Sequence, residues 1–321
     1  MRLLIEFTPH GGTLQRISNE DIPLTHQWFS YVFSFSSFRL DLNEYYGGYA
    51  SPSFSDITVS PDAFASWPPS GDALFKVMLT DSTEAAAVTI FNGYGTPKDF
   101  DREGVSYDLT VQEYSDTITS GTSQSGTLLA LMTTYCSTLS LTIDSSNARA
   151  TSPAVDYTPT SDTPLIDIMM GMCSFFTHGF KIIDGTLFLF DMLATGTTKD
   201  LTGFDVLPCS YGKADPVSLV KCSDYSVAGS SAYGKEVSIS TAYHTTQSLI
   251  EAALTNIKTL IESDITEIDA MLDQTTVTVL DNITLVDKST VSDTLTTAKV
   301  TSTLYNFDDY TVQIEAVGAI S

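Results

Sequence analysis

One long apolar stripe interrupts a sequence that otherwise consists of strand-like segments and loops. Seven aliphatic residues recur at steps of four, three, four, four, three and four: Ile250, Leu254, Ile257, Ile261, Ile265, Ile268 and Leu272. This is the period of one helix face, so it predicts a single helix over residues 247–273, about 40 Å long at 1.5 Å per residue. The apolar face of such a helix needs a surface to cover it.

Two surfaces could cover this stripe. Isoleucine at both a- and d-like positions favours three- or four-stranded association between subunits. The same period is needed when a helix covers a sheet of its own chain. Lys258 is the one basic residue along the segment, so the interhelical ion pairs of a free coiled coil are missing. The seven residues are candidates for packing or assembly contacts, and both interpretations stay open.

The charge balance excludes one class of function. The 321 residues include 15 Lys and Arg against 39 Asp and Glu, a formal net charge of −24. Because nucleic-acid affinity comes largely from basic side chains that displace counterions, DNA binding is excluded as a main activity, as is docking on anionic lipid. Hydrophobic residues make up 42% of the chain, which is enough to form a core, and the length suggests about two domains.

Targeting and metal signals are also missing from the sequence. The first apolar run meets Glu6 at once, and no run approaches the ~18 apolar residues of a membrane span, so we expect neither a signal peptide nor a span. The four cysteines lack CxxC spacing and the histidines lack zinc-ligand spacing. Reduced, buried thiols of a protein made in the cytoplasm are expected at Cys136, Cys173, Cys209 and Cys222.

Residues 1–120 predict an all-β barrel or sandwich. Apolar and polar side chains alternate within residues 28–35 and 104–111, the period of a half-buried strand. Further strands are expected at residues 2–7, 54–59, 73–80 and 88–91.

Residues 121–195 mix helices and strands, and they contain an internal repeat. Leu128, Met132 and Cys136 map onto Leu165, Met169 and Cys173 at one constant offset. The repeat predicts helices over 128–136 and 165–173, each followed by a strand, at 139–144 and 180–184. Asp184-Gly185 then predicts a two-residue hairpin turn. In residues 196–321, strands are expected at 276–280, 283–286, 298–304 and 310–316.

No motif predicts catalysis. Asp308 with Asp309, or Asp41 with Glu44, could hold a cation or act as a glycosidase acid and base, but such neighbours arise by chance among 39 acids. His178 lies beside aromatic residues and outside any Ser or Cys motif, which indicates a structural role. We therefore expect no enzyme activity, no cofactor and no metal.

Two patterns resemble the tail hub proteins of tailed bacteriophages. The first is a short helix, a glycine-containing loop and a hairpin, found here over residues 165–190 with Gly179 in the loop. The second is a closing strand pair that ends in Glu-x-x-Gly, found here over residues 298–318 with Glu315 and Gly318. Residues 216–221, 46–49 and 67–69 also look like segments of hub and tail-tip proteins.

The resemblance implies a β-rich α+β fold, with two tube-type β-barrel domains, a smaller inserted α+β domain and one long helix. Applied to this chain, it places the first barrel at residues 1–120, the insert at 121–195 and the second barrel, with helix 247–273, at 196–321. In this family, barrels from three subunits form a pseudo-hexameric ring that joins a sixfold tube to a threefold tip.

The function implied by the resemblance is that of a structural virion protein at the tail tip, assembled in the host cytoplasm. We expect a homotrimeric hub of a non-contractile tail, since no lysozyme or needle segment is appended. Such a hub surrounds the DNA channel and joins the tail tube or distal tail ring to tip or fibre proteins. The alternatives are a hexameric distal tail or tube protein, and a tail-associated carbohydrate-binding or hydrolase module. Acidic residues facing the channel would repel a passing genome, which gives the net charge of −24 a possible use.

Overall fold

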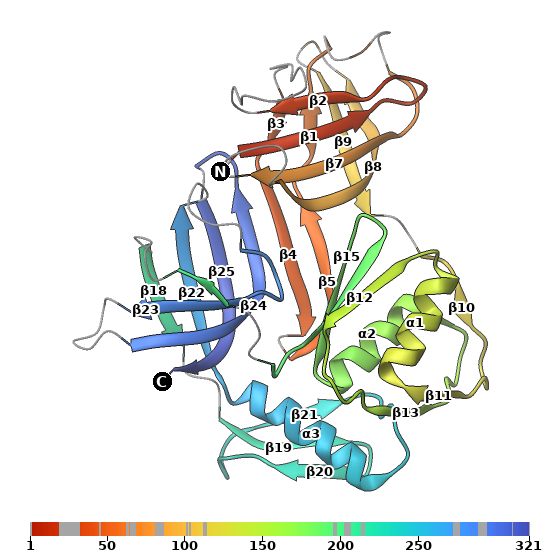
Figure 1. Cartoon of the computed structure of the whole chain (residues 1–321), viewed down its shortest axis with the longest axis vertical. Coiled ribbons are helices and arrows are strands. Elements are labelled where there is room, and N and C mark those ends of the chain that lie inside the picture. Colours follow the sequence, from red (N-terminus) through yellow and green to blue (C-terminus); the bar gives the residue numbers. More distant parts are fainter. Residues whose placement is uncertain are drawn as a thin grey trace.

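The computed structural model describes residues 2–18, 33–44, 46–61, 64, 69–80, 87–100, 102, 104–111, 114–194, 198–201, 207–212, 216–271, 277–287, 294–309 and 311–320. This part of the chain is β-rich and has three helices, α1 (Leu128–Thr138), α2 (Leu165–Phe175) and α3 (Gln247–Ile261). Figure 1 shows one large sheet at the top of the view, a second in the centre and left, α1 and α2 at the right, and α3 with a small sheet at the bottom. The prediction of a β-rich α+β chain is confirmed.

The upper sheet is a half-barrel of seven antiparallel strands. Its strands are β1 (Arg2–Thr8), β2 (Gln15–Ser18), β3 (Phe33–Phe35), β6 (Ile57–Val59), β7 (Ala73–Thr80), β8 (Val88–Phe100) and β9 (Val105–Val111), in the order β2-β1-β7-β8-β9-β6-β3. Its core contains an aromatic cluster, in which the Phe7 and Phe75 rings lie 5.3 Å apart and Tyr107 meets Phe75 edge-on at 5.2 Å.

The second large sheet has eleven strands drawn from three regions of the sequence. They are β4 (Ser37–Glu44), β5 (Gly47–Phe54), β12 (Thr142–Asn147), β15 (His178–Ile183), β16 (Thr186–Asp191), β17 (Thr198–Asp200), β18 (Leu207–Gly212), β22 (Asp264–Met271), β23 (Asn282–Asp287), β24 (Thr294–Asn306) and β25 (Thr311–Ile320). The main path runs β12-β16-β15-β5-β4-β24-β25-β22-β18, and β23 and β17 extend from β24. The 13-residue β24 pairs with β25 along its length, with β23 near its start and with β4 near its end.

The large sheet connects regions that the sequence suggests as separate units. β4 and β5, which lie within residues 1–120, pair with each other, and β4 also pairs with the C-terminal β24. The middle segment joins the same sheet where β15 runs parallel to β5, with Gly179 opposite Gly48 and Phe180 opposite Tyr49. The Tyr49 and Phe180 rings stack with centroids 5.0 Å apart at this junction. Gly48 has φ +108, and a Cβ there would collide with the Asn43 side chain, so glycine is required in this tight β4–β5 turn.

The internal repeat is present as two 11-residue helices that pack against each other. α1 leads into β12 and α2 into β15. The six repeated positions are all buried, with exposed fractions of 3% or less: Leu128, Met132, Cys136, Leu165, Met169 and Cys173. The predicted hairpin is also confirmed, because Asp184 (φ 53) and Gly185 (φ 73) form the turn between β15 and β16.

Short strand pairs complete the middle segment. β10 (Thr117–Ile118) pairs with β14 (Thr163–Pro164), and β11 (Gln124–Thr127) pairs with β13 (Ala154–Tyr157). The Thr127 hydroxyl accepts a hydrogen bond from the Ala130 N–H at 3.3 Å and so caps the start of α1.

The predicted helix over 247–273 is wrong in its length. α3 ends at Ile261, and after a turn at Glu262 and Ser263 the chain enters the strand β22. All eight residues of β22 pair with β25, and the other edge of β22 pairs with β18. This pairing outweighs the helical period of the sequence, because β-branched residues suit a sheet as well as a helix face. The predicted strand over 276–280 is also wrong in its described part, since residues 277–280 form no strand and end in a turn.

α3 packs on a small three-stranded sheet. The strands are β19 (Val217–Cys222), β20 (Tyr225–Ala228) and β21 (Lys235–Ile239), in the order β20-β19-β21. Within the described residues, no helix is long and apolar enough to cross a membrane.

Candidate functional site

The stripe residues separate into two elements of the structure. Ile250, Leu254, Ile257 and Ile261 lie on the buried face of α3, each 2% exposed or less. The helix contacts β19 and β20 of its own chain, so this face is covered within the subunit. Ile265 and Ile268 lie on β22, and Leu272 lies outside the described residues.

A buried polar cluster lies where α2, β12 and β16 meet. We call Arg149, Thr177, His178 and Asp191 the Arg149 cluster. Arg149 follows β12, Thr177 lies between α2 and β15, His178 begins β15, and Asp191 ends β16. His178 and Asp191 are register partners across the β15–β16 hairpin. Arg149 and Asp191 are 42 positions apart and belong to no motif, so the sequence did not predict them as site residues.

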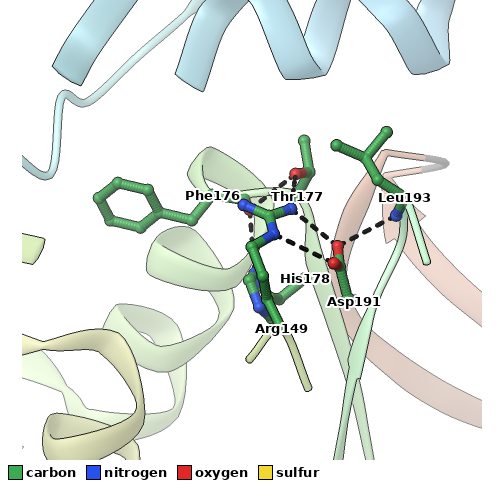
Figure 2. Close-up of polar contacts among 6 residues, drawn as sticks. All are labelled: Arg149, Phe176, Thr177, His178, Asp191 and Leu193. Carbon is green, nitrogen blue, oxygen red and sulfur yellow. Dashed lines mark hydrogen bonds and ion pairs between the residues drawn. The ribbon is translucent and has the colours of Figure 1, made fainter. Parts of the chain in front are cut away.

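The guanidinium of Arg149 is the centre of this cluster (Figure 2). Its Nε donates to Asp191 Oδ2 at 3.0 Å and its Nη2 to Asp191 Oδ1 at 2.7 Å, a bidentate ion pair. The same Nη2 lies 3.1 Å from the Thr177 hydroxyl, which donates to the Phe176 carbonyl at 2.7 Å. On the other side of the carboxylate, the Leu193 N–H donates to Asp191 Oδ1 at 3.1 Å. The cluster thus fixes the α2–β15 connection against the end of β16.

Burial and hydrogen bonding together set the ionisation of the cluster. Burial opposes the charge on Asp191, but the hydrogen bonds from Arg149 and the Leu193 N–H outweigh it, so the pKa of this carboxyl lies below its ordinary value. His178 is 1% exposed, and its Nδ1 lies 2.9 Å from the Phe176 carbonyl. Burial, together with the nearby charge of Arg149, lowers the pKa of His178 to about 4. His178 is therefore neutral at pH 7, which fits a structural histidine.

We expect acid to destabilise the protein through His178. The unfolded chain takes up a proton on this ring at about pH 6.5, and the folded chain does so only near pH 4, so the unfolded state binds more protons between these values. The free energy of unfolding should therefore fall by about 3 kcal/mol as the pH drops from about 6.5 to about 4. Urea titrations across this range measure the slope. His178→Gln should flatten it and the exposed His10→Gln should not; equal slopes in all three proteins would exclude His178 as the cause.

The described residues show no arrangement suited to metal binding. They contain no group of three or more His, Cys, Asp or Glu side chains that could hold a metal ion. Asp41 is engaged with Arg39 Nε at 2.6 Å and the Ser302 hydroxyl at 2.6 Å, and Asp309 accepts from the Thr311 hydroxyl at 2.6 Å. These carboxylates make structural contacts.

The described thiols are buried and unpaired. Cys136, Cys173 and Cys222 are free, and burial raises the pKa of all three, to about 11 for Cys136. A thiol that stays protonated is a poor nucleophile, so these cysteines act as small core residues. The side chain of Cys209 lies outside the described residues.

Comparison with known proteins identifies a fold but no sequence family. No protein-family model matches the sequence, and no curated protein is significantly similar to it. Among solved structures, a 43 kDa tail protein of prophage MuSo2 from Shewanella oneidensis aligns over 98% of both chains, with a TM-score of 0.56 and 10% identity. A tail protein from Neisseria meningitidis MC58 aligns over 98% of this chain and 96% of its own, with a TM-score of 0.57 and 9% identity.

A third structure gives the same result. The prophage tail protein gp18 from Listeria monocytogenes EGD-e aligns over 98% of this chain and 94% of its own, with a TM-score of 0.52 and 11% identity. At such identities the likeness concerns the fold, and it extends along nearly the whole chain. The protein has the fold of these phage tail proteins.

Proposed function

We propose that this chain is a structural protein of a phage tail tip, a hub that forms a ring around the DNA channel and joins the tail tube to tip or fibre proteins. The observation that carries the proposal is the likeness in fold to three tail proteins over 98% of the chain. A hub of this kind works mechanically: it seals the tube, anchors its neighbours and lets DNA pass.

Open sheet edges support a ring. β2 and β3 end the seven-stranded sheet, and β18 ends the large sheet, so in the described part of the chain each pairs with a neighbour on one side. Unpaired strand edges are templates for pairing with another chain, and a closed ring would cover them. The division into a first barrel at 1–120, an insert at 121–195 and a second barrel at 196–321 stays part of this proposal.

The charge pattern supports a channel that does not bind the genome. Ion pairs to the chain's own carboxylates engage many basic side chains: Arg16, Arg39, Lys76, Lys98, Arg149, Lys199 and Lys221. With 39 acidic residues in the chain, this leaves a surplus of acidic groups for the surface. A channel wall with such a surplus repels DNA and keeps it from sticking.

We expect the purified chain to assemble as a trimer. Native mass spectrometry should give a complex of three 34.8 kDa chains. A stable six-subunit ring would instead support a hexameric distal tail or tube protein. A chain that stays monomeric at all concentrations would contradict the hub.

Carbohydrate binding is a second candidate, favoured by one pocket. A cavity of about 390 Å³ between the upper sheet and the β15–β16 turn is lined by Tyr49, Tyr94 and Tyr114, among other residues. Aromatic side chains with polar tips are typical of mixed apolar and polar binding surfaces. Saturable binding on a glycan array that Tyr94→Ala abolishes would favour this function. Reproducible cleavage of a polysaccharide, abolished by one carboxylate substitution, would make the chain a hydrolase.

A further inference from the structure

A second pocket lies where the middle segment meets the C-terminal strands. It has a volume of about 390 Å³. Its lining combines the end of β12, the strands β16, β17 and β24, and the turn before β23, and includes Asn147, Phe190, Lys199, Asp281, Asn282 and Lys299. Two lysines in one pocket are unexpected in a chain with 15 basic and 39 acidic residues.

Lys299 gives this pocket a positive charge. It lies in β24 between Asn282 of β23 and Val317 of β25, and it is 6% exposed. Among the described residues, no hydrogen bond or ion pair engages its ammonium group. A charged group in a largely buried position without a partner is unfavourable, so such a group is expected to meet a counter-charge. The side chain lines the pocket, which is where that counter-charge can enter.

The neighbouring charged groups are already engaged. Lys199 donates to Asp281 at 2.7 Å, and the same carboxylate oxygen accepts from the Thr278 N–H at 2.9 Å. Lys181 Nζ donates to the Val279 carbonyl at 2.9 Å and lies 5.3 Å from the centroid of the Phe190 ring.

The Arg149 cluster supplies further charges to this region. Asp191 is held by Arg149 in the bidentate pair, and it interacts with Lys299 electrostatically, as Asp281 does. The cations Arg149, Lys181, Lys199 and Lys299 thus face the two carboxylates of Asp191 and Asp281. Among these six described groups, positive charge exceeds negative charge, in a chain whose net charge is −24.

We propose that this pocket is a binding site for an oxyanion, a carboxylate or a phosphate-type group, held by the ammonium of Lys299 with Lys199 as the second cation of the lining. The oxyanion comes either from a free small molecule or from an acidic side chain of a protein partner, and both sources present the same chemistry. The proposal stands on the pocket and its lysines, and it does not depend on a role in a phage tail.

Protonation of Lys299 gives the site a pH dependence. Burial lowers the pKa of Lys299 to about 8, although Asp191 and Asp281 act in the opposite direction. Burial also lowers the pKa of Lys181 to about 8, with Asp281 opposing this effect and Lys199 adding to it. Lys299 is therefore mostly charged at pH 7 and mostly neutral at pH 9. Affinity for an anion that does not itself titrate in this range should fall about tenfold between these pH values.

The test is a titration of the full chain with sodium sulfate, followed through the ¹³Cε resonances of its lysines at constant ionic strength. Sulfate should shift the Lys299 resonance saturably, raise the pKa of Lys299, and bind about tenfold more weakly at pH 9. Lys299→Met should lose this binding as measured by calorimetry, whereas Lys235→Met, on the exposed start of β21, should keep it. The wild-type resonance answers the question even if Lys299→Met folds poorly.

Parallel titrations with acetate and with a short Glu-rich peptide identify the source of the anion. A response to sulfate with none to the peptide supports a small free anion, and a tighter response to the peptide supports an acidic partner segment. A Lys299 resonance that none of the three probes moves, or a shift that Lys235 shares equally, would overturn the proposal.

Discussion

Ile257→Asp should destabilise the protein by about 4 kcal/mol or more, enough to unfold the α3 region or the whole chain. Ile257 is fully buried in the middle of α3, where the helix packs on β19 and β20. The substitution removes a large apolar side chain from this interface and puts a carboxylate in its place. Urea denaturation, followed by circular dichroism, measures the loss.

The same helix offers a matched control. Leu249 lies on the outer face of α3 and is 40% exposed. Leu249→Asp adds the same charge near the start of the helix, where the helix dipole favours acidic residues, so we expect little change in stability. Equal losses in the two variants would mean that helix propensity, and not the buried face, determines stability here. An unchanged melting temperature for Ile257→Asp would contradict the packing of α3.

Arg149→Ala should cost about 3 kcal/mol of unfolding free energy. Asp191 is 6% exposed, and without Arg149 its carboxylate would be buried with the Leu193 N–H as its remaining donor in the cluster. Breaking a buried pair on one side is more damaging than removing both charges, so Arg149→Ala combined with Asp191→Ala should recover part of the loss. Denaturation of the two single variants and of the double variant completes the cycle.

The pH dependence separates this prediction from a simple packing defect. In the wild type the lowered pKa of Asp191 adds stability above the unfolded pKa of about 3.9, and this stability is lost as the pH falls through the folded pKa. In Arg149→Ala burial acts unopposed by the guanidinium, so the pKa of Asp191 should rise and the defect should shrink as acid neutralises the carboxylate. Lys221→Ala, which breaks the exposed pair to Glu236, serves as the control and should cost less than about 1 kcal/mol. A defect in Arg149→Ala that is constant from neutral to acid pH would mean that lost packing is its cause.

Local features of the fold could be predicted from the sequence. The Asp184-Gly185 turn was predictable because both residues tolerate the positive φ that a two-residue hairpin demands. The presence of two similar helix–strand units was predictable because Leu128, Met132 and Cys136 recur at one offset as Leu165, Met169 and Cys173. In each case the information lies within a short segment.

Features that depend on distant partners could not be predicted in this way. Ile265 and Ile268 continue the helical steps of four and three. Their backbone nevertheless pairs in a sheet with β25, which lies about fifty residues further along the chain. Pairing of β4 with β24 joins segments more than 250 residues apart, and the hydrophobic period within either segment does not predict this pairing. The Arg149–Asp191 pair likewise could not be predicted from the sequence, because neither residue belongs to a motif. The one available signal was the scarcity of basic residues, which makes each one inside an apolar region worth testing for a buried partner.

Imaging of tailed particles shows whether this chain is a tail-tip hub. Particles from the host that carries this sequence should be labelled with antibodies against the chain and examined by electron microscopy, followed by a reconstruction of the labelled region. We expect label at the distal end of the tail and a ring of three copies around the channel. Label along the whole tail shaft, or intact infectious particles that lack the protein, would contradict it.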